Sequence, residues 1–286
     1  MAPRVFIGVV THEGSRFREP ATAQLDALAA RARDRGWQVA TAVNAHDGYS
    51  REEFPLGRGV ILRSALAQAR LEHRWRRYLA HGEELPPVAG AARWIRDAAL
   101  LAGTATVRSA RYLGPRPLSP VDRLPGSSAV VRLLNIDLSH IDLLQQAQES
   151  DWALILEDDA QAEGGPAAMD RVLDAFDALA GTPVAFINAS RSIDHDALGV
   201  AGLLGPRVDG RRAARIPITN TVCAVAYSAS TLAWLPHAIE GSGLMPVVPI
   251  DWRLNRAVMD AVHERRLGPD ACVWLDPAPF VQGSMH

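Results

Sequence analysis

Short apolar runs alternate along this chain with segments whose apolar residues recur at helical spacing, and this order predicts an α/β fold. Residues 5–10 form a short, β-branched run that ends in Thr-His-Glu-Gly, which is typical of a buried strand followed by a turn. Leucine and alanine then recur at helical spacing over residues 25–32, and Gly36 predicts the end of that helix. A second strand is expected over residues 37–43. This order of strand, helix and strand favours a mostly parallel central sheet.

The rest of the chain continues the alternation without a repeat or a linker, which indicates a single domain over residues 1–286. Ser139 is expected to cap a helix that ends near Ser150. Residues 82–128 are rich in proline and glycine and contain a helical piece around 91–101, so this stretch is expected to be a lid or an insertion. The other expected helices are 60–81, 167–180 and 251–268, and the other expected strands are 152–156, 184–187, 222–227 and 273–275.

Composition excludes several classes of protein. Hydrophobic residues make up 48% of the chain and charged residues 22%, which is ordinary for a globular domain and not for a disordered one. The formal net charge of −2 gives no basic bias toward nucleic acid. No run approaches the length of a membrane span, so a cytoplasmic protein is expected. The two cysteines, Cys223 and Cys272, are interpreted as buried thiols, and a bridge between them is the alternative.

Three consecutive carboxylates, Glu157-Asp158-Asp159, follow directly after the apolar run 152–156. Side chains of like charge at the end of a buried strand repel one another, and a cation relieves that repulsion. Oxygen ligands suit Mg²⁺ or Mn²⁺, and open α/β sheets bind ligands beyond the carboxyl ends of their strands. The triplet therefore predicts a divalent metal site, and a solvated acidic turn is the alternative.

Two segments in a fixed order carry a resemblance to a known family. Leu138-Ser139-His140, followed by a helix and then by Leu154-Ile155-Leu156-Glu157-Asp158-Asp159, resembles the lipopolysaccharide and collagen galactosyltransferase family, with its "LSH" and "ILEDD" motifs. Asn44 stands where that family often has Asp, and residues 82–128 have no recognised counterpart. Further matches in the expected order are residues 42–48, 223–228, 249–252 and 279–284.

The resemblance implies a GT-A fold, a nucleotide-sugar donor that is expected to be a UDP-sugar, a divalent metal, and inversion at the anomeric carbon. It places Thr11-His12-Glu13 against the base and ribose of the nucleotide, although this run also suits a simple turn. Asp47 is a candidate for the uracil or the ribose, with a turn as its alternative. His140 is implied to face the donor, with a core or capping histidine as the alternative. Asp158 is expected to support the metal or the ribose.

The metal is expected to be Mn²⁺ or Mg²⁺, with Asp159 as a direct ligand and Glu157 in support. A late histidine can complete such a site, which makes His286 a further candidate ligand; a frayed end is the alternative. The acceptor is expected to be a sugar, a lipid-linked molecule or another small molecule.

Asp251 is the candidate catalytic base. It follows Pro249-Ile250 and begins a predicted helix whose other face is apolar. Backbone N–H groups at a helix start favour an ionised carboxylate, which can then accept a proton. The alternative for Asp251 is a helix cap.

Several weaker candidates and two competing functions stay open. A metal-dependent nucleotidyltransferase or phosphotransferase would need a glycine-rich phosphate loop and an early lysine, and this chain has no lysine. A non-catalytic sugar-nucleotide-binding protein is the other alternative. Arginines are candidate contacts for phosphate or for an anionic acceptor or lipid surface, although a solvated face suits them as well. These weaker candidates are Arg16, Arg18 and the arginines of residues 63–77, together with Asn188, Ser190 and Arg191 on the acceptor side.

Overall fold

Strands and helices alternate along the part of the chain that the structure, a computed structural model, describes: residues 2–48, 58–81, 91–113, 126–191, 204–214, 222–240, 248–268 and 270–283. The strands are β1 (Arg4–Val10), β2 (Gln38–Asn44), β3 (Trp152–Glu157), β4 (Ala160–Ala162), β5 (Phe186–Asn188), β6 (Ser190–Arg191), β7 (Arg211–Ala214), β8 (Ala224–Ser228), β9 (Cys272–Leu275) and β10 (Phe280–Gln282). The helices are α1 (Arg18–Asp34), α2 (Arg58–His81), α3 (Ala91–Leu113), α4 (Gly126–Gln146), α5 (Pro166–Leu179), α6 (Ala229–Leu232), α7 (Leu235–Glu240) and α8 (Ile250–His263).

The main sheet has seven strands in the order β2-β1-β3-β8-β5-β9-β7. β1 is parallel to both β2 and β3, and β9 is parallel to β5, whereas β8 is antiparallel to β3 and β5, and β7 is antiparallel to β9. The predicted α/β class is confirmed, but the sheet that was expected to be mostly parallel is mixed. The physical reason is that a strand buried on both faces shows the same apolar run in either direction, so its sequence does not reveal its orientation.

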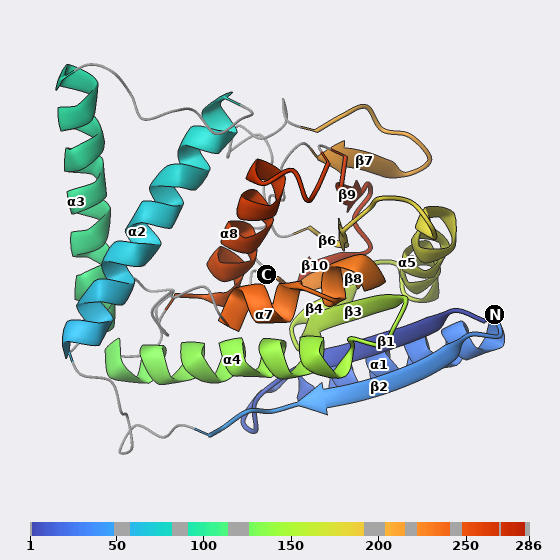
Figure 1. The fold of residues 1–286 in the computed structure, drawn as a ribbon. Coiled ribbons are helices and arrows are strands. Elements are labelled where there is room, and N and C mark those ends of the chain that lie inside the picture. The colour runs from blue at the N-terminus through green and yellow to red at the C-terminus, as the bar shows by residue number, and fades with distance from the viewer. Residues whose placement is uncertain are drawn as a thin grey trace.

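Helices cover both faces of this sheet (Figure 1). α1 and α5 pack on one face, and α4, α7 and α8 pack on the other. Consecutive side chains of β3 point alternately to the two faces: Trp152, Leu154 and Leu156 join the first core, and Ala153 and Ile155 join the second. β3 is therefore a central strand, and its sequence is apolar without alternation because neither face meets solvent.

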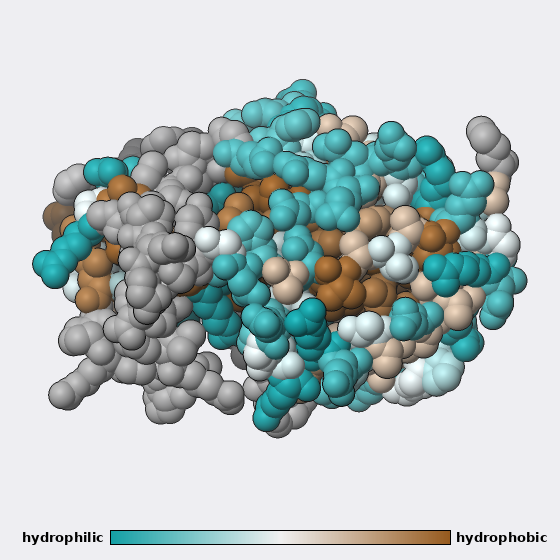
Figure 2. Space-filling view, turned by 90° about the horizontal axis from the view of Figure 1, so that it is seen from below, coloured by the Kyte–Doolittle hydropathy of each residue, from teal (hydrophilic) through white to brown (hydrophobic). Residues whose placement is uncertain are grey.

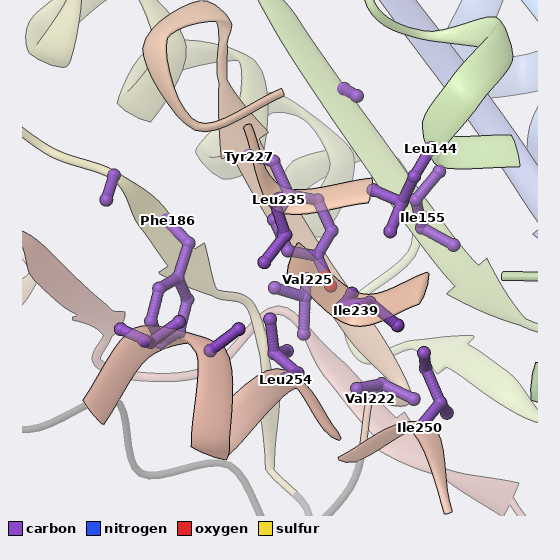
Figure 3. Packing of buried hydrophobic residues seen from close by; sticks show 14 of the residues in the cluster. Leu144, Ile155, Phe186, Val222, Val225, Tyr227, Leu235, Ile239, Ile250 and Leu254 are labelled. Carbon is purple, nitrogen blue, oxygen red and sulfur yellow. The ribbon is translucent and has the colours of Figure 1, made fainter. Parts of the chain in front are cut away.

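The second core holds α4, α7 and α8 against the sheet. Figure 3 shows Ile155 and Val225 of the sheet packed beneath side chains of α4, α7 and α8, among them Leu144, Ile239 and Leu254. Apolar burial of this kind contributes about 25 cal/mol per Å² removed from water. α8 is thus held against the sheet along its apolar side, as the sequence predicted.

Gly8 allows α4 to approach the sheet closely. A Cβ atom at this position would lie 3.0 Å from a carbon of Phe6 and 3.1 Å from carbons of Ile155 and Leu143. Leu143 belongs to α4, so the missing side chain in β1 makes room for this helix. α4 carries the Leu-Ser-His motif, and the distance of that motif from the sheet depends on Gly8.

A small second sheet brings the end of the chain to the acidic triplet. It has the order β4-β10-β6, with β10 antiparallel to β4 and parallel to β6. Beyond β10, the N–H of Gly283 donates a 2.7 Å hydrogen bond to the carbonyl oxygen of Asp159. Residues 284–286, and with them His286, lie outside the described residues.

α2 and α3 lie side by side, in opposite directions, at one end of the molecule (Figure 1). Ile61 near the start of α2 packs with Tyr112 near the end of α3 and with Val130 of α4. α3 is longer than the predicted piece 91–101, and the expectation of a lid over 82–128 stays a prediction.

No described helix is both long enough and apolar enough to span a membrane. Seen from below, the surface is mostly hydrophilic, with separate apolar patches (Figure 2).

Gly8→Val is expected to destabilise the fold. Its extra atoms collide with Ile155 and Leu143, and overpacking of this kind costs about 1–3 kcal/mol. Urea unfolding followed by circular dichroism measures the change. Gly268→Ala is the matched control, because a Cβ atom there meets nothing within 4 Å. Equal unfolding midpoints for the two variants would contradict the role given to Gly8.

Candidate active site

The carboxyl ends of β1, β2 and β3 meet at one edge of the main sheet. Val10 of β1 pairs with Asn44 of β2 on one side and with Glu157 of β3 on the other. Parallel strands in this register place the loops that follow them next to each other. The predicted residues Thr11-His12-Glu13, Asp47 and Glu157-Asp158-Asp159 therefore all begin at this edge.

The side chains of Thr11 and Asp158 are in direct contact. Thr11 is buried, and its hydroxyl Oγ1 donates a 2.8 Å hydrogen bond to Oδ2 of Asp158. The N–H of Asp158 donates to the carbonyl oxygen of Val10 at 2.9 Å, which fixes the turn after β3 against the end of β1. Asp159 is the most buried carboxylate of the triplet, with 8% of its surface exposed, and Glu157 and Asp158 are half-buried.

His140 lies against the first carboxylate of the triplet. It is almost fully buried, with 1% of its surface exposed, and its Nε2 is 3.5 Å from Oε1 of Glu157. Ser139, which was predicted to cap a helix, instead lies within α4, and its Oγ accepts a 3.1 Å hydrogen bond from the N–H of His46. The prediction was wrong because α4 begins at Gly126. Residues 126–138 were not recognised as its first turns, so Ser139 was mistaken for the start of the helix. Ser139 holds the loop after β2 in place of capping a helix.

The other predicted donor residues lie in exposed loops at the same edge. His12 and Glu13 are in the turn after β1, and Asp47 follows the His46 that Ser139 holds. Asn188, by contrast, is 1% exposed, and its Oδ1 accepts hydrogen bonds from the N–H and the hydroxyl of Ser190, both at 3.1 Å. The Asn188 side chain thus supports its own turn and does not line an open surface.

Asp251 is the second residue of α8 and is half-buried. Loss of hydration raises the pKa of its carboxyl from 3.8 to about 7. Two influences lower this pKa: the N–H of Trp252, which donates a 3.0 Å hydrogen bond to Oδ1, and the positive charge of Arg108. The negative charge of Glu157 raises it. Asp251 is therefore electrostatically linked to Glu157, the first carboxylate of the triplet.

Asp137 fixes the start of α8, and sequence reasoning missed it. It is 3% exposed, its Oδ1 accepts a 2.8 Å hydrogen bond from the N–H of Ile250, and its Oδ2 lies 3.4 Å from Nε of Arg253. Burial raises the pKa of Asp137 well above 3.8, and the positive charge of Arg253 opposes that rise. An acidic residue between Ile136 and Leu138 in an apolar helix was the available signal, but its partner lies far along the sequence.

The donor chemistry of the triplet suits a hard divalent cation, although the predicted set of ligands does not converge. Among the described residues, no group of three or more histidine, cysteine, aspartate and glutamate side chains could hold a metal ion. Magnesium and similar ions are usually bound through one or two carboxylates, with substrate phosphates and water completing the shell. Glu157 and Asp159 fit that kind of site, and His286 is outside the described residues.

Both cysteines are free and buried, as predicted, and burial raises the pKa of each thiol.

No protein-family model matches this chain, and no curated protein shows a significant similarity to it. A fold of this class supports many functions, so function is inferred from the side chains at the sheet edge.

Asp251→Asn is expected to stabilise the protein increasingly as pH rises. Between pH 4 and 7 the unfolded chain has an ionised Asp251 while the folded chain retains the proton, so wild-type stability falls with pH over this window. Asparagine does not titrate, and the difference in Tm between variant and wild type should therefore grow from pH 5 to pH 8. Differential scanning fluorimetry measures it.

The exposed Asp26→Asn is the matched control, and its Tm difference should stay flat over the same range. The negative charge of Asp251 is one of the influences that raise the pKa of Asp137, so the measured difference contains this coupling as well as the titration of Asp251 itself. A constant Tm difference for Asp251→Asn from pH 5 to pH 8 would show that Asp251 is not held neutral by its surroundings.

Proposed function

We propose that this protein is a metal-dependent glycosyltransferase with a GT-A fold, which transfers a sugar from a nucleoside diphosphate, expected to be UDP, to an acceptor hydroxyl. The observation that carries the proposal is the meeting of the carboxyl ends of β1, β2 and β3, which brings Thr11 and the acidic triplet to one edge of the sheet. The negative charge of Glu157 also raises the pKa of Asp251, which couples this edge to the start of α8. Transfer with inversion needs these two parts: carboxylates that bind the metal and diphosphate, and a separate base for the acceptor.

The donor side is supported by the loops at this edge. Thr11 and Asp158 form one hydrogen-bonded unit, and the loop that carries Asp47 is fastened to α4 through Ser139. Open α/β sheets bind nucleotides beyond the carboxyl ends of their strands. In the proposed complex, Thr11, His12, Glu13 and Asp47 contact the nucleoside, and His140 orients Glu157.

Glu157 and Asp159 would hold Mn²⁺ or Mg²⁺, which neutralises the diphosphate and favours its departure as a leaving group. The three adjacent carboxylates also explain why this edge needs a cation when an anionic diphosphate binds. Without one, the negative charges of ligand and protein would repel each other.

Asp251 acts as the base in the proposed reaction. The acceptor oxygen forms a bond to the anomeric carbon, its proton passes to the Asp251 carboxylate, and the bond from that carbon to the diphosphate oxygen breaks, releasing the nucleoside diphosphate. Attack opposite to the leaving group inverts the anomeric configuration. A pKa of about 7 suits this role, because a general base is most effective when its pKa lies near the working pH.

Calorimetry tests the donor half of the proposal. UDP is expected to bind wild-type protein with Mn²⁺ at least tenfold more tightly than in EDTA, because the ion offsets repulsion between the diphosphate and the triplet. Asp159→Ala should remove this metal dependence, and Asp26→Ala, which changes an exposed carboxylate elsewhere, should not. Equal UDP affinity in Mn²⁺ and in EDTA for the wild type would overturn the proposed metal site.

Kinetics of Asp251→Asn test the other half. The variant should bind UDP with Mn²⁺ as the wild type does and should lose about 10²- to 10⁴-fold in the rate of sugar transfer, because asparagine cannot accept the proton. In the wild type, kcat/KM should rise with pH and level off above about 7, where Asp251 is ionised. A wild-type rate in the variant, or a product with retained anomeric configuration by NMR, would rule out this base.

A further inference from the structure

A groove lies between α2 and α3, the pair of helices that packs on the helix carrying the candidate base. Its volume is about 590 Å³, within the range of about 300–1,000 Å³ that small-molecule sites occupy. The groove is lined by Glu72 of α2 and by one side of α3 from Ala99 to Arg108. Neither the metal site nor the donor-binding loops described above use these residues.

A buried ion pair forms the polar part of the groove. Glu72 is 3% exposed, and its Oε1 accepts a 2.7 Å hydrogen bond from Nε of Arg108. The two charges compensate each other, so the pair does not select for an anionic or a cationic ligand. Both residues line the groove, so a carboxylate acceptor and guanidinium N–H donors lie side by side in its wall, and a sugar hydroxyl, which both donates and accepts, matches such a pair.

The rest of the groove is apolar or small. Leu100 and Val107 are 50% and 57% exposed, and Gly103 lies between them on the same side of α3. A Cβ atom at Gly103 would meet nothing within 4 Å. This surface offers an alkyl or aromatic group a place to be buried, and it does so beside the ion pair.

The hairpin of α2 and α3 is fastened to the helix that carries the base. Trp75 of α2 packs edge-on against Trp252, with ring centroids 5.5 Å apart, and Arg74 lies 2.5 Å from Asp260 of α8. Trp252 directly follows Asp251. The positive charge of Arg108 also reaches Asp251, where it favours the ionised form. The polar end of the groove is therefore electrostatically coupled to Asp251, and α2, which contributes Glu72 to it, packs on the helix that carries Asp251.

We infer that this groove binds the acceptor, and that the acceptor is an uncharged glycoside with an apolar aglycone. Its sugar hydroxyls contact Glu72 and Arg108 while one of them meets Asp251, and its apolar group lies along Leu100, Gly103 and Val107. This inference rests on the proposed function, which requires an acceptor at Asp251. On this inference, the side chains of α3 determine which class of acceptor binds.

Binding of two neutral probes tests the inference directly. Saturation-transfer NMR titrations compare n-octyl β-D-glucopyranoside, below its critical micelle concentration, with methyl β-D-glucopyranoside in the presence of UDP and Mn²⁺. The octyl compound should bind wild-type protein at least tenfold more tightly, because only its chain can be buried in the groove. Gly103→Leu fills the groove and should remove that advantage.

The variant is expected to fold, because leucine has open space at this position and a higher helix propensity than glycine. Thr106→Leu adds the same side chain to an exposed position of α3 that does not line the groove, and it should keep the tenfold preference. Equal binding of the two probes to the wild type, or an unchanged preference in Gly103→Leu, would overturn the inference.

The same samples separate this inference from the proposed function. UDP affinity with Mn²⁺ should be equal in the wild type, Gly103→Leu and Thr106→Leu, because the groove does not include the metal ligands. Octyl glucoside binding that depends on Gly103, in a protein that binds no UDP, would support a glycoside site and reject the glycosyltransferase. Metal-dependent UDP binding without a preference for the octyl probe would reject the groove alone.

Discussion

One buried carboxylate, Asp137, determines how the two halves of the candidate site meet. It projects from α4, three residues before the His140 that contacts Glu157, and it accepts a hydrogen bond from the first N–H of α8, the helix that carries Asp251. The proposed donor side and the proposed base are thus held by residues of one helix. Removing the Asp137 carboxylate would leave the buried N–H of Ile250 without its acceptor, which costs about 1–3 kcal/mol, so this hydrogen bond makes the arrangement hard to change.

The same constraint accounts for the chemistry of Asp251. A helix start that is anchored to the body of the protein can keep its carboxylate half-buried, and burial together with the charge of Glu157 brings its pKa to about 7. A freely solvated cap would remain ionised at much lower pH. A carboxyl group whose pKa lies near 7 can both lose and accept a proton at neutral pH, which is the property that the proposed role of Asp251 requires.

Sequence patterns predicted the buried strand β3, the position of the triplet at its end and the start of α8 within one residue, because each depends on local periodicity. They failed where distant segments decide. The orientation of β8 depends on its neighbours β3 and β5, and Ser139 lies inside a helix whose earlier turns are weakly marked. The hydrogen bond between Asp137 and Ile250 joins residues 113 positions apart, and the one between Glu72 and Arg108 joins residues 36 positions apart. No local pattern reveals either pair. The predictions for His286 and for metal binding at Glu157 and Asp159 remain predictions.

The position of a bound Mn²⁺ ion tests the central claim most directly. Crystals grown with UDP and Mn²⁺, measured at a wavelength where manganese scatters anomalously, locate the ion independently of any assumption about its ligands. The account predicts an anomalous peak within about 2.6 Å of a carboxylate oxygen of Asp159, in contact with the diphosphate and on the side of the sheet edge that faces Asp251. A peak bound elsewhere, or UDP bound at this edge with no ion between the diphosphate and the triplet, would contradict it.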